Sequence, residues 1–173
     1  MKLTRLATTM AASVLIAAPL AACSTDSTTD SASSAAVSTT TESAAASTPS
    51  QILSSTAWET TGAVDQNGAH PALTDSDVAA YVGYAYFQPD GTFTMFTLDD
   101  APKMQGDWTV TPDGKTRTIV AKDPAGKVLF TRDSPITELT PEVFTYRTYP
   151  DPKNTAEYID IIHTPTTHAR PRA

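Results

Sequence analysis

The sequence predicts an all-β protein, a small antiparallel barrel of eight strands with one short helix. Short segments rich in Thr, Val, Ile, Tyr and Phe, which favour pleated structure, recur between positions 54 and 163. Turn sequences such as Pro-Asp-Gly and Pro-Ala-Gly separate them. The chain has a single cysteine, so burial of apolar side chains rather than disulfides must hold the domain together.

The turns divide the chain into segments of strand length. They lie at residues 88–91, 111–114, 123–126 and 149–152. The expected strands are 54–60, 83–88, 92–98, 105–111, 115–122, 127–133, 143–149 and 156–163. A short helix is expected before the second strand, with Thr74 as N-cap, Asp77 at the capping-box position, Val78 and Tyr81 on the apolar face and Gly83 at its end.

Alternation of side chains predicts the inner face of several strands. Trp108 and Val110 share one face, and Phe144 and Tyr146 share a face opposite Arg147 and Tyr149. The residues expected to fill the interior or line a pocket are Trp58, Trp108, Phe87, Phe93, Phe96, Phe130, Phe144, Tyr146 and Ile162. Closure into a barrel would remove both sheet edges, whereas a two-sheet sandwich is the competing arrangement.

The N-terminus carries a secretory pattern. Lys2 and Arg5 precede an apolar stretch that ends in Leu20-Ala21-Ala22-Cys23, so residues 1–22 are expected to be a signal peptide. The end of this stretch, Leu20-Ala21-Ala22-Cys23, resembles a bacterial lipobox. The resemblance implies that Cys23 carries a diacylglycerol anchor at the extracytoplasmic face of the cell membrane. A chance cysteine beside an ordinary cleavage site is the alternative. Residues 23–50, nearly all Ser, Thr and Ala after Cys23, are expected to form a disordered tether.

Four stretches of the chain resemble small lipocalin-like bacterial lipoproteins. The sequence LSSTAWETT is similar to an opening Trp strand of that family, and YFQPDGTFTMF, GDWTVTPDGKTRTIV and ITELTPEVFTYRTY are similar to its hairpins. The resemblance covers residues 51–165 and leaves 166–173 as a tail. It implies a calyx-like barrel on a lipid anchor, in domains of unknown function, and it transfers no catalytic residues.

Candidate ligand-binding residues follow from the strand faces. Arg147 and Tyr149 share a face, and inward they could hold a ligand carboxylate. Because the apolar bulk of Phe144 and Tyr146 argues that those two face inward, the preferred interpretation places Arg147 outside, paired with an acid. Trp58, Trp108, Tyr86 and Tyr146 complete the candidate set.

Other chemistry has weak support. Asp160, His163 and His168 are close in sequence, but Asp160 and His163 should point to opposite faces, His163 should lie at the rim and His168 in an exposed tail. Asp99, Asp100 and Asp107 lack a Ca²⁺-loop pattern, and Lys103 is expected to neutralise them. We expect no catalytic residue, metal or cofactor.

Composition limits the possible partners. The formal net charge is −7 and no basic run occurs, so we do not expect the protein to bind nucleic acid. We expect a monomer that meets the membrane through its anchor and binds a small apolar ligand or an envelope component. A packed structural or protein-interaction module is the alternative, and a hydrolase is less favoured. A cavity of a few hundred Å³ would distinguish the carrier from the packed module.

Overall fold

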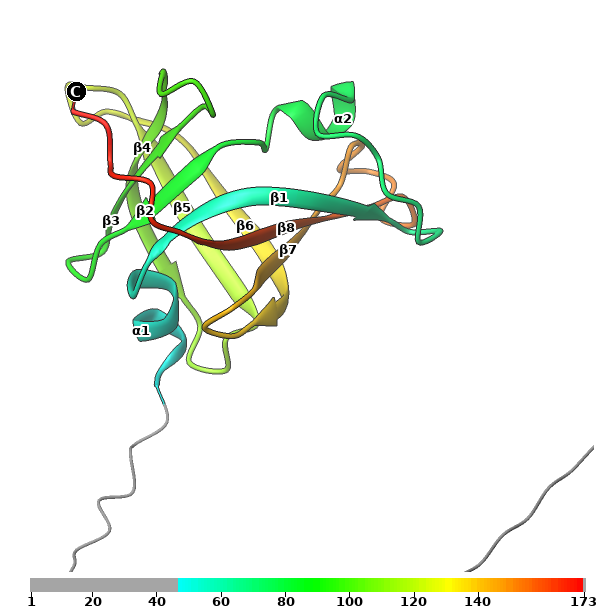
Figure 1. The fold of residues 1–173 in the computed structure, drawn as a ribbon, viewed down its shortest axis with the longest axis horizontal. Helices are drawn as coiled ribbons and strands as arrows, with labels where there is room; N and C mark the ends of the chain where they lie inside the picture. Colours follow the sequence, from blue (N-terminus) through cyan, green and yellow to red (C-terminus); the bar gives the residue numbers. More distant parts are fainter. Residues whose placement is uncertain (1–46, 173) are drawn as a thin grey trace, which may run out of the picture. The chain divides into compact units, whose positions relative to one another are not determined.

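The predicted barrel is confirmed: eight antiparallel strands close in the order β1 to β8 (Figure 1). The computed structural model describes residues 47–172. The strands are β1 Ala57–Asp65, β2 Tyr84–Phe87, β3 Thr92–Phe96, β4 Pro102–Val110, β5 Thr116–Lys122, β6 Val128–Leu139, β7 Phe144–Thr148 and β8 Ile159–Thr166. Every neighbouring pair is antiparallel, and β1 pairs with β8 from Ala57↔Thr166 to Asp65↔Ile159. The sandwich alternative is therefore wrong.

The two ends of the barrel differ, and we name them by the helix each carries. Helix α1, Pro49–Ser54, lies at one end together with the β2–β3, β4–β5 and β6–β7 turns (Figure 1). Helix α2, Ser76–Ala79, lies in the connection between β1 and β2, at the end that carries the β3–β4 and β5–β6 loops. Among residues 47–172, neither helix has the length and apolar character that crossing a membrane requires.

Helix α1 was not predicted: residues 49 and 50 were assigned to the tether, 54 to the first strand, and 51–53 to no element. Pro49 occupies the first turn, Thr48 is the N-cap, and Thr48 and Gln51 form a reciprocal capping box. Leu53 is completely buried, and its carbonyl accepts a hydrogen bond from the indole N–H of Trp58 at 2.9 Å. The helix thus belongs to the folded domain and packs over the barrel interior at the α1 end.

Helix α2 lies where a helix was expected, but its cap differs. Asp75, not Thr74, is the N-cap, and no side-chain hydrogen bond caps the helix. Val78 on its apolar face is completely buried, as predicted. The helix ends at Ala79, so the expected end at Gly83 is wrong and Tyr81 lies beyond the helix.

The interior is filled mainly by aromatic side chains. Trp58, Phe87, Phe93, Phe144 and Tyr146 are buried in one cluster, joined by Trp108 and by β-branched residues of β5 and β8. Phe144 packs edge-on against Trp58 and Phe87, at centroid distances of 5.8 and 6.2 Å. Such edge-on contacts between rings from different strands stabilise the packed interior of the barrel.

One residue expected to fill the interior or line a pocket does neither. Ile161 faces inward and is completely buried, whereas Ile162 pairs with Thr145 on the outer face and is half-buried. Phe96 is buried and lines a pocket, as predicted, although it packs edge-on against Tyr86 outside the main cluster. The predicted inward position is confirmed for Trp58, Trp108, Phe87, Phe93, Phe144 and Tyr146, and Phe130 packs partly buried against the cluster.

Candidate functional site

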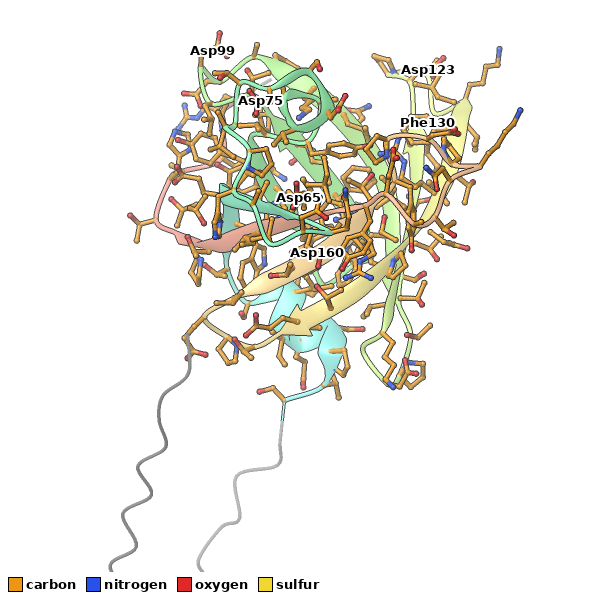
Figure 2. The ribbon with its side chains drawn as sticks, turned by 90° about the vertical axis from the view of Figure 1, so that its right-hand side faces the viewer. Asp65, Asp75, Asp99, Asp123, Phe130 and Asp160 are labelled. Carbon is orange, nitrogen blue, oxygen red and sulfur yellow. The ribbon has the colours of Figure 1, made fainter. Side chains whose placement is uncertain are left out.

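An apolar pocket opens at the α2 end of the barrel. Its volume is about 330 Å³, and β3, β4, β5 and β6 form its walls. Its lining includes the apolar side chains of Met95, Phe96, Met104, Leu129 and Phe130. Figure 2 shows Phe130 and Asp123 where β5 and β6 meet in their hairpin, beyond the packed part of the interior. We call this the mouth pocket.

A second, much smaller cavity lies within the barrel. Its volume is about 20 Å³, enough for one water molecule or one monatomic ion. Its lining includes the polar side chains of Thr60, Lys103, Arg117, Tyr146 and His163. Met95, Phe96 and Lys103 line both spaces, so the two are adjacent. We call it the polar cavity.

Arg117 is the most deeply buried cation of the site. It is 2% exposed and extends from β5 across the interior, with its guanidinium carbon 4.2 Å from the ring centroid of Tyr146 and 5.8 Å from that of Phe87. Nη2 donates a long hydrogen bond of 3.4 Å to Ser134 Oγ, and Nε has no partner among the described residues. Burial lowers the pKa of Arg117, but a guanidinium starts so high that it stays charged at neutral pH.

His163 is buried beside Arg117 and is not the rim residue that the sequence predicted. Its Nε2 lies 3.1 Å from Thr60 Oγ1, which also contacts the carbonyl oxygen of Gly83 at 3.2 Å. Burial, reinforced by the positive charge of Arg117, lowers the pKa of His163 to about 3. The imidazole is therefore neutral at physiological pH.

Lys103 stands between the polar cavity and the mouth pocket. Its ammonium donates to the carbonyl oxygen of Val82 at 2.6 Å, and burial lowers its pKa. The expectation that Lys103 neutralises the nearby carboxylates is wrong. Asp107 pairs instead with Lys122, and Asp100 lies 3.3 Å from His168 Nε2.

Arg147 faces away from the interior, as the preferred interpretation of its strand predicted. It forms two parallel hydrogen bonds with Asp160, at 2.8 and 2.9 Å, and its guanidinium stacks 3.4 Å from the ring centroid of Tyr158. Asp160 raises the pKa of Arg147. Tyr149 follows β7 on the same outer face and is half-buried. The two residues therefore do not reach the cavities.

The other candidate residues divide by strand face. Trp58, Trp108 and Tyr146 point inward, but the indole N–H groups donate to the carbonyl oxygens of Leu53 and Gln88 and so are committed to the fold. Tyr86 is buried on the outer side, where its hydroxyl lies 2.8 Å from His168 Nδ1. Only Tyr146 of this set lines the polar cavity.

The C-terminal segment is more ordered than a tail. Strand β8 continues to Thr166, and the ring of His168 stacks on Tyr84 with centroids 4.0 Å apart. The expectation of an exposed His168 is therefore wrong. Asp160, His163 and His168 also do not converge, and no group of three or more His, Cys, Asp or Glu suited to a metal ion occurs within residues 47–172. Cys23 lies outside the described residues.

A closed eight-stranded barrel with a polar cluster inside and an apolar pocket at one end defines a small β-barrel domain. The chain belongs to the family described as a domain of unknown function (DUF4822), which matches residues 50–172. This is consistent with the lipocalin-like resemblance of the hairpins. No curated protein matches the chain.

Sequence reasoning did not find Arg117, and it treated Lys103 only as a partner for acids. A signal for Arg117 exists: in TRTIVAK it alternates with Ile119 and Ala121 and must share their face. Lys103 gives no such signal, because the pairing of β3 with β4 is irregular between Met95 and Phe96.

Proposed function

We propose that this protein is an extracytoplasmic lipoprotein whose barrel binds a small apolar or amphiphilic molecule in the mouth pocket. The observation that carries the proposal is a pocket of about 330 Å³ whose surface is mostly apolar and whose lining includes two Met, two Phe and one Leu. Pockets that bind small molecules start at about 300 Å³ and are mostly apolar with a few polar groups. The lipid anchor rests on the sequence Leu20-Ala21-Ala22-Cys23 alone.

The chemistry of the lining favours a flexible apolar ligand. Met95 and Met104 pair across β3 and β4, and unbranched thioether side chains adapt to ligands of different shape. Phe130 offers a ring, and Lys103 is the cation that reaches the pocket from the side of the polar cavity. An apolar body with an anionic or polar end matches this arrangement.

The ligand is proposed for the end of the barrel and not for its centre. The rings of Phe87, Phe144 and Tyr146 pack at the centre, leaving only the polar cavity of about 20 Å³. A calyx enclosing the whole ligand is therefore disfavoured.

A protein-interaction module is the second candidate, because two apolar side chains at the start of β6 are exposed. Val128 is 51% exposed and Leu129 is 61% exposed. They are neighbours at the β-bulge of β6 opposite Ala121 and Lys122, and of the two only Leu129 lines the mouth pocket. This difference separates the two candidates.

The test is a titration of the full chain with N-phenyl-1-naphthylamine, a neutral apolar dye that fluoresces when it leaves water. We expect saturable binding that decanol and decanoate displace. Leu129→Glu should weaken dye binding by about tenfold or more, because it places a charge in the pocket wall. Val128→Glu, the matched control, should leave dye affinity within about twofold.

Absence of saturable binding, or equal losses in Leu129→Glu and Val128→Glu, would remove the small-molecule proposal. Both substitutions replace exposed side chains, so neither should prevent folding.

A further inference from the structure

The polar cavity holds more positive charge than its surroundings compensate. Arg117 and Lys103 both line it, and no Asp or Glu does. The ion pairs formed by Lys and Arg in the described part of the chain are Lys122–Asp107 and Arg147–Asp160, and they use neither cation. This occurs in a chain whose formal net charge is −7.

The protein gives the buried guanidinium of Arg117 fewer hydrogen bonds than water would. The interior supplies one hydrogen bond of 3.4 Å to Ser134 and the ring faces of Phe87, Phe144 and Tyr146. The buried Nε has no partner among residues 47–172. Cation–π contacts stabilise a guanidinium, but they carry no negative charge. A buried charge without a counter-charge is costly. Binding an anion beside Arg117 and Lys103 would therefore stabilise the fold.

The neighbouring groups supply no negative charge at neutral pH. His163 is neutral and shares the hydroxyl of Thr60, and both residues line the cavity. The Tyr146 hydroxyl favours the charged form of Arg117, but it is itself neutral at this pH because burial raises its pKa. Arg132, on β6, is a further cation, and it lowers the pKa of Arg117.

From this geometry we propose that the polar cavity is a binding site for one small monovalent anion, held by Arg117 and Lys103. Its volume of about 20 Å³ admits a monatomic ion such as chloride or bromide. The same charge could arrive as the carboxylate of an amphiphile whose apolar part lies in the mouth pocket, because the two spaces share Met95, Phe96 and Lys103.

A water molecule is the competing occupant. It would fill the same volume and accept a hydrogen bond, but it would leave the charges of Arg117 and Lys103 uncompensated. The two occupants differ in their response to salt, because only an anion links the stability of the fold to the anion concentration.

The first test measures thermal unfolding of the full chain in sodium chloride, sodium bromide and sodium gluconate at equal ionic strength. Chloride and bromide should raise the Tm by about 3 °C or more over gluconate, whose carboxylate is attached to a hydroxylated chain that does not match the apolar mouth pocket. Arg117→Met should abolish this difference. Arg132→Met removes an exposed arginine of the neighbouring strand and should keep it.

Arg117→Met should also be at least as stable as the wild type in gluconate, since it removes a buried charge that lacks a partner there. Equal Tm values for the wild type in all three salts, or the same halide effect in Arg117→Met, would overturn the site. Should Arg117→Met fail to fold, Lys103→Met takes its place, with a reduced halide effect expected.

Crystals grown in sodium bromide provide the second test. We expect an anomalous bromine peak enclosed by Arg117, Lys103 and His163, and density of water alone there would overturn the proposal. Octanoate and octanol separate the two sources of the anion. Loss of the bromine peak with octanoate but not octanol assigns the carboxylate of an amphiphile, whereas a peak that survives both assigns a free halide. The bromide result does not depend on dye binding, so this site and the mouth-pocket function can fail separately.

Discussion

His163 couples the stability of the barrel to pH. Its pKa lies at about 3 in the folded state, against 6.5 for an ordinary imidazole, because the ring is buried near Arg117. Between these values the unfolded chain binds a proton that the folded chain does not. The stabilisation is complete above about pH 6.5 and is lost as the pH falls from there toward about 3.

We expect the free energy of unfolding to fall as the pH is lowered from about 7 to about 4, with His163 contributing up to about 1.4 kcal/mol per pH unit. His163→Gln should show a shallower slope. His70→Gln, which removes an exposed imidazole, is the control. The measurement is urea unfolding followed by tryptophan fluorescence in gluconate, so that no halide sits beside the ring. Parallel slopes for the two variants would contradict a buried neutral His163.

Gly106 is required by the close approach of two strands. A Cβ at this position would lie 1.9 Å from the carbonyl oxygen of Val120, and the backbone has a φ of +154°. The nearest contact of a Cβ at Gly62 would be an ordinary 3.7 Å, to Ile162. We expect Gly106→Ala to destabilise the protein by about 2 kcal/mol or more, because β4 and β5 must separate to admit the methyl group.

Gly62→Ala should change stability by less than about 1 kcal/mol, because its methyl group meets no close atom. Urea unfolding of both variants provides the measurement. Similar losses in the two would show that the constraint is general flexibility of the sheet and not the contact with Val120.

The alternation of side chains along a strand explains which inward and outward positions could be predicted from the sequence. Phe144 and Tyr146 determine the face of β7, so the outward position of Arg147 followed from the sequence. Ile161 and Ile162 are equally apolar, so composition could not choose between them; pairing with Phe144 fixes His163 inward and Ile161 with it. The inward position of Arg117 was predictable by the same alternation. It was missed because arginine is almost never fully buried unless an acid pairs with it.

At the scale of elements, helix α1 acts as the closing piece of one barrel end. It contacts β2, β4 and β6, and Leu53 inserts completely buried into the core cluster. We expect Leu53→Ala to cost about 2–5 kcal/mol of the free energy of unfolding, through the cavity it leaves. Leu129→Ala, at a residue 61% exposed, should cost less than about 0.5 kcal/mol.

Chemical denaturation of the two leucine variants distinguishes a packed helix from a loosely attached one. If Leu53→Ala were as stable as Leu129→Ala, α1 would not belong to the cooperative fold. Tryptophan fluorescence is a suitable signal, because the carbonyl of Leu53 accepts the hydrogen bond of the Trp58 indole.

The elements that were wrong in the sequence analysis had competing local signals. The capping box of Thr48 and Gln51, with Pro49 between them, is visible in the sequence, but it adjoins a tract of Ser, Thr and Ala that suggests no structure. Strand β6 runs six residues beyond the expected end at Asp133, through Pro135. Pro135 pairs with Thr116 at the start of β5, where the loss of one amide interrupts little of the ladder.

At the scale of the whole molecule, closure follows from many short hairpins and one long-range pairing. Seven of the eight strand pairs join neighbours in sequence, and four of these were predictable from the turns at 88–91, 111–114, 123–126 and 149–152. The pairing of β1 with β8 joins the two ends of the domain, and only the cost of exposed edges predicted it. The walls of the mouth pocket come from four consecutive strands, β3 to β6, so no single segment of the sequence carries its signature.

The last prediction concerns the attachment of the molecule. If Cys23 carries a diacylglycerol, the full chain should fractionate with membranes in a bacterial host that processes lipoproteins, because two acyl chains make the association durable. Cys23→Ala should release the protein into the soluble or secreted fraction, or leave an uncleaved precursor. Ser24→Ala, one residue along the chain, should remain membrane-bound and processed. Mass spectrometry of the N-terminal peptide measures both outcomes. Membrane retention and normal processing of Cys23→Ala would contradict lipidation.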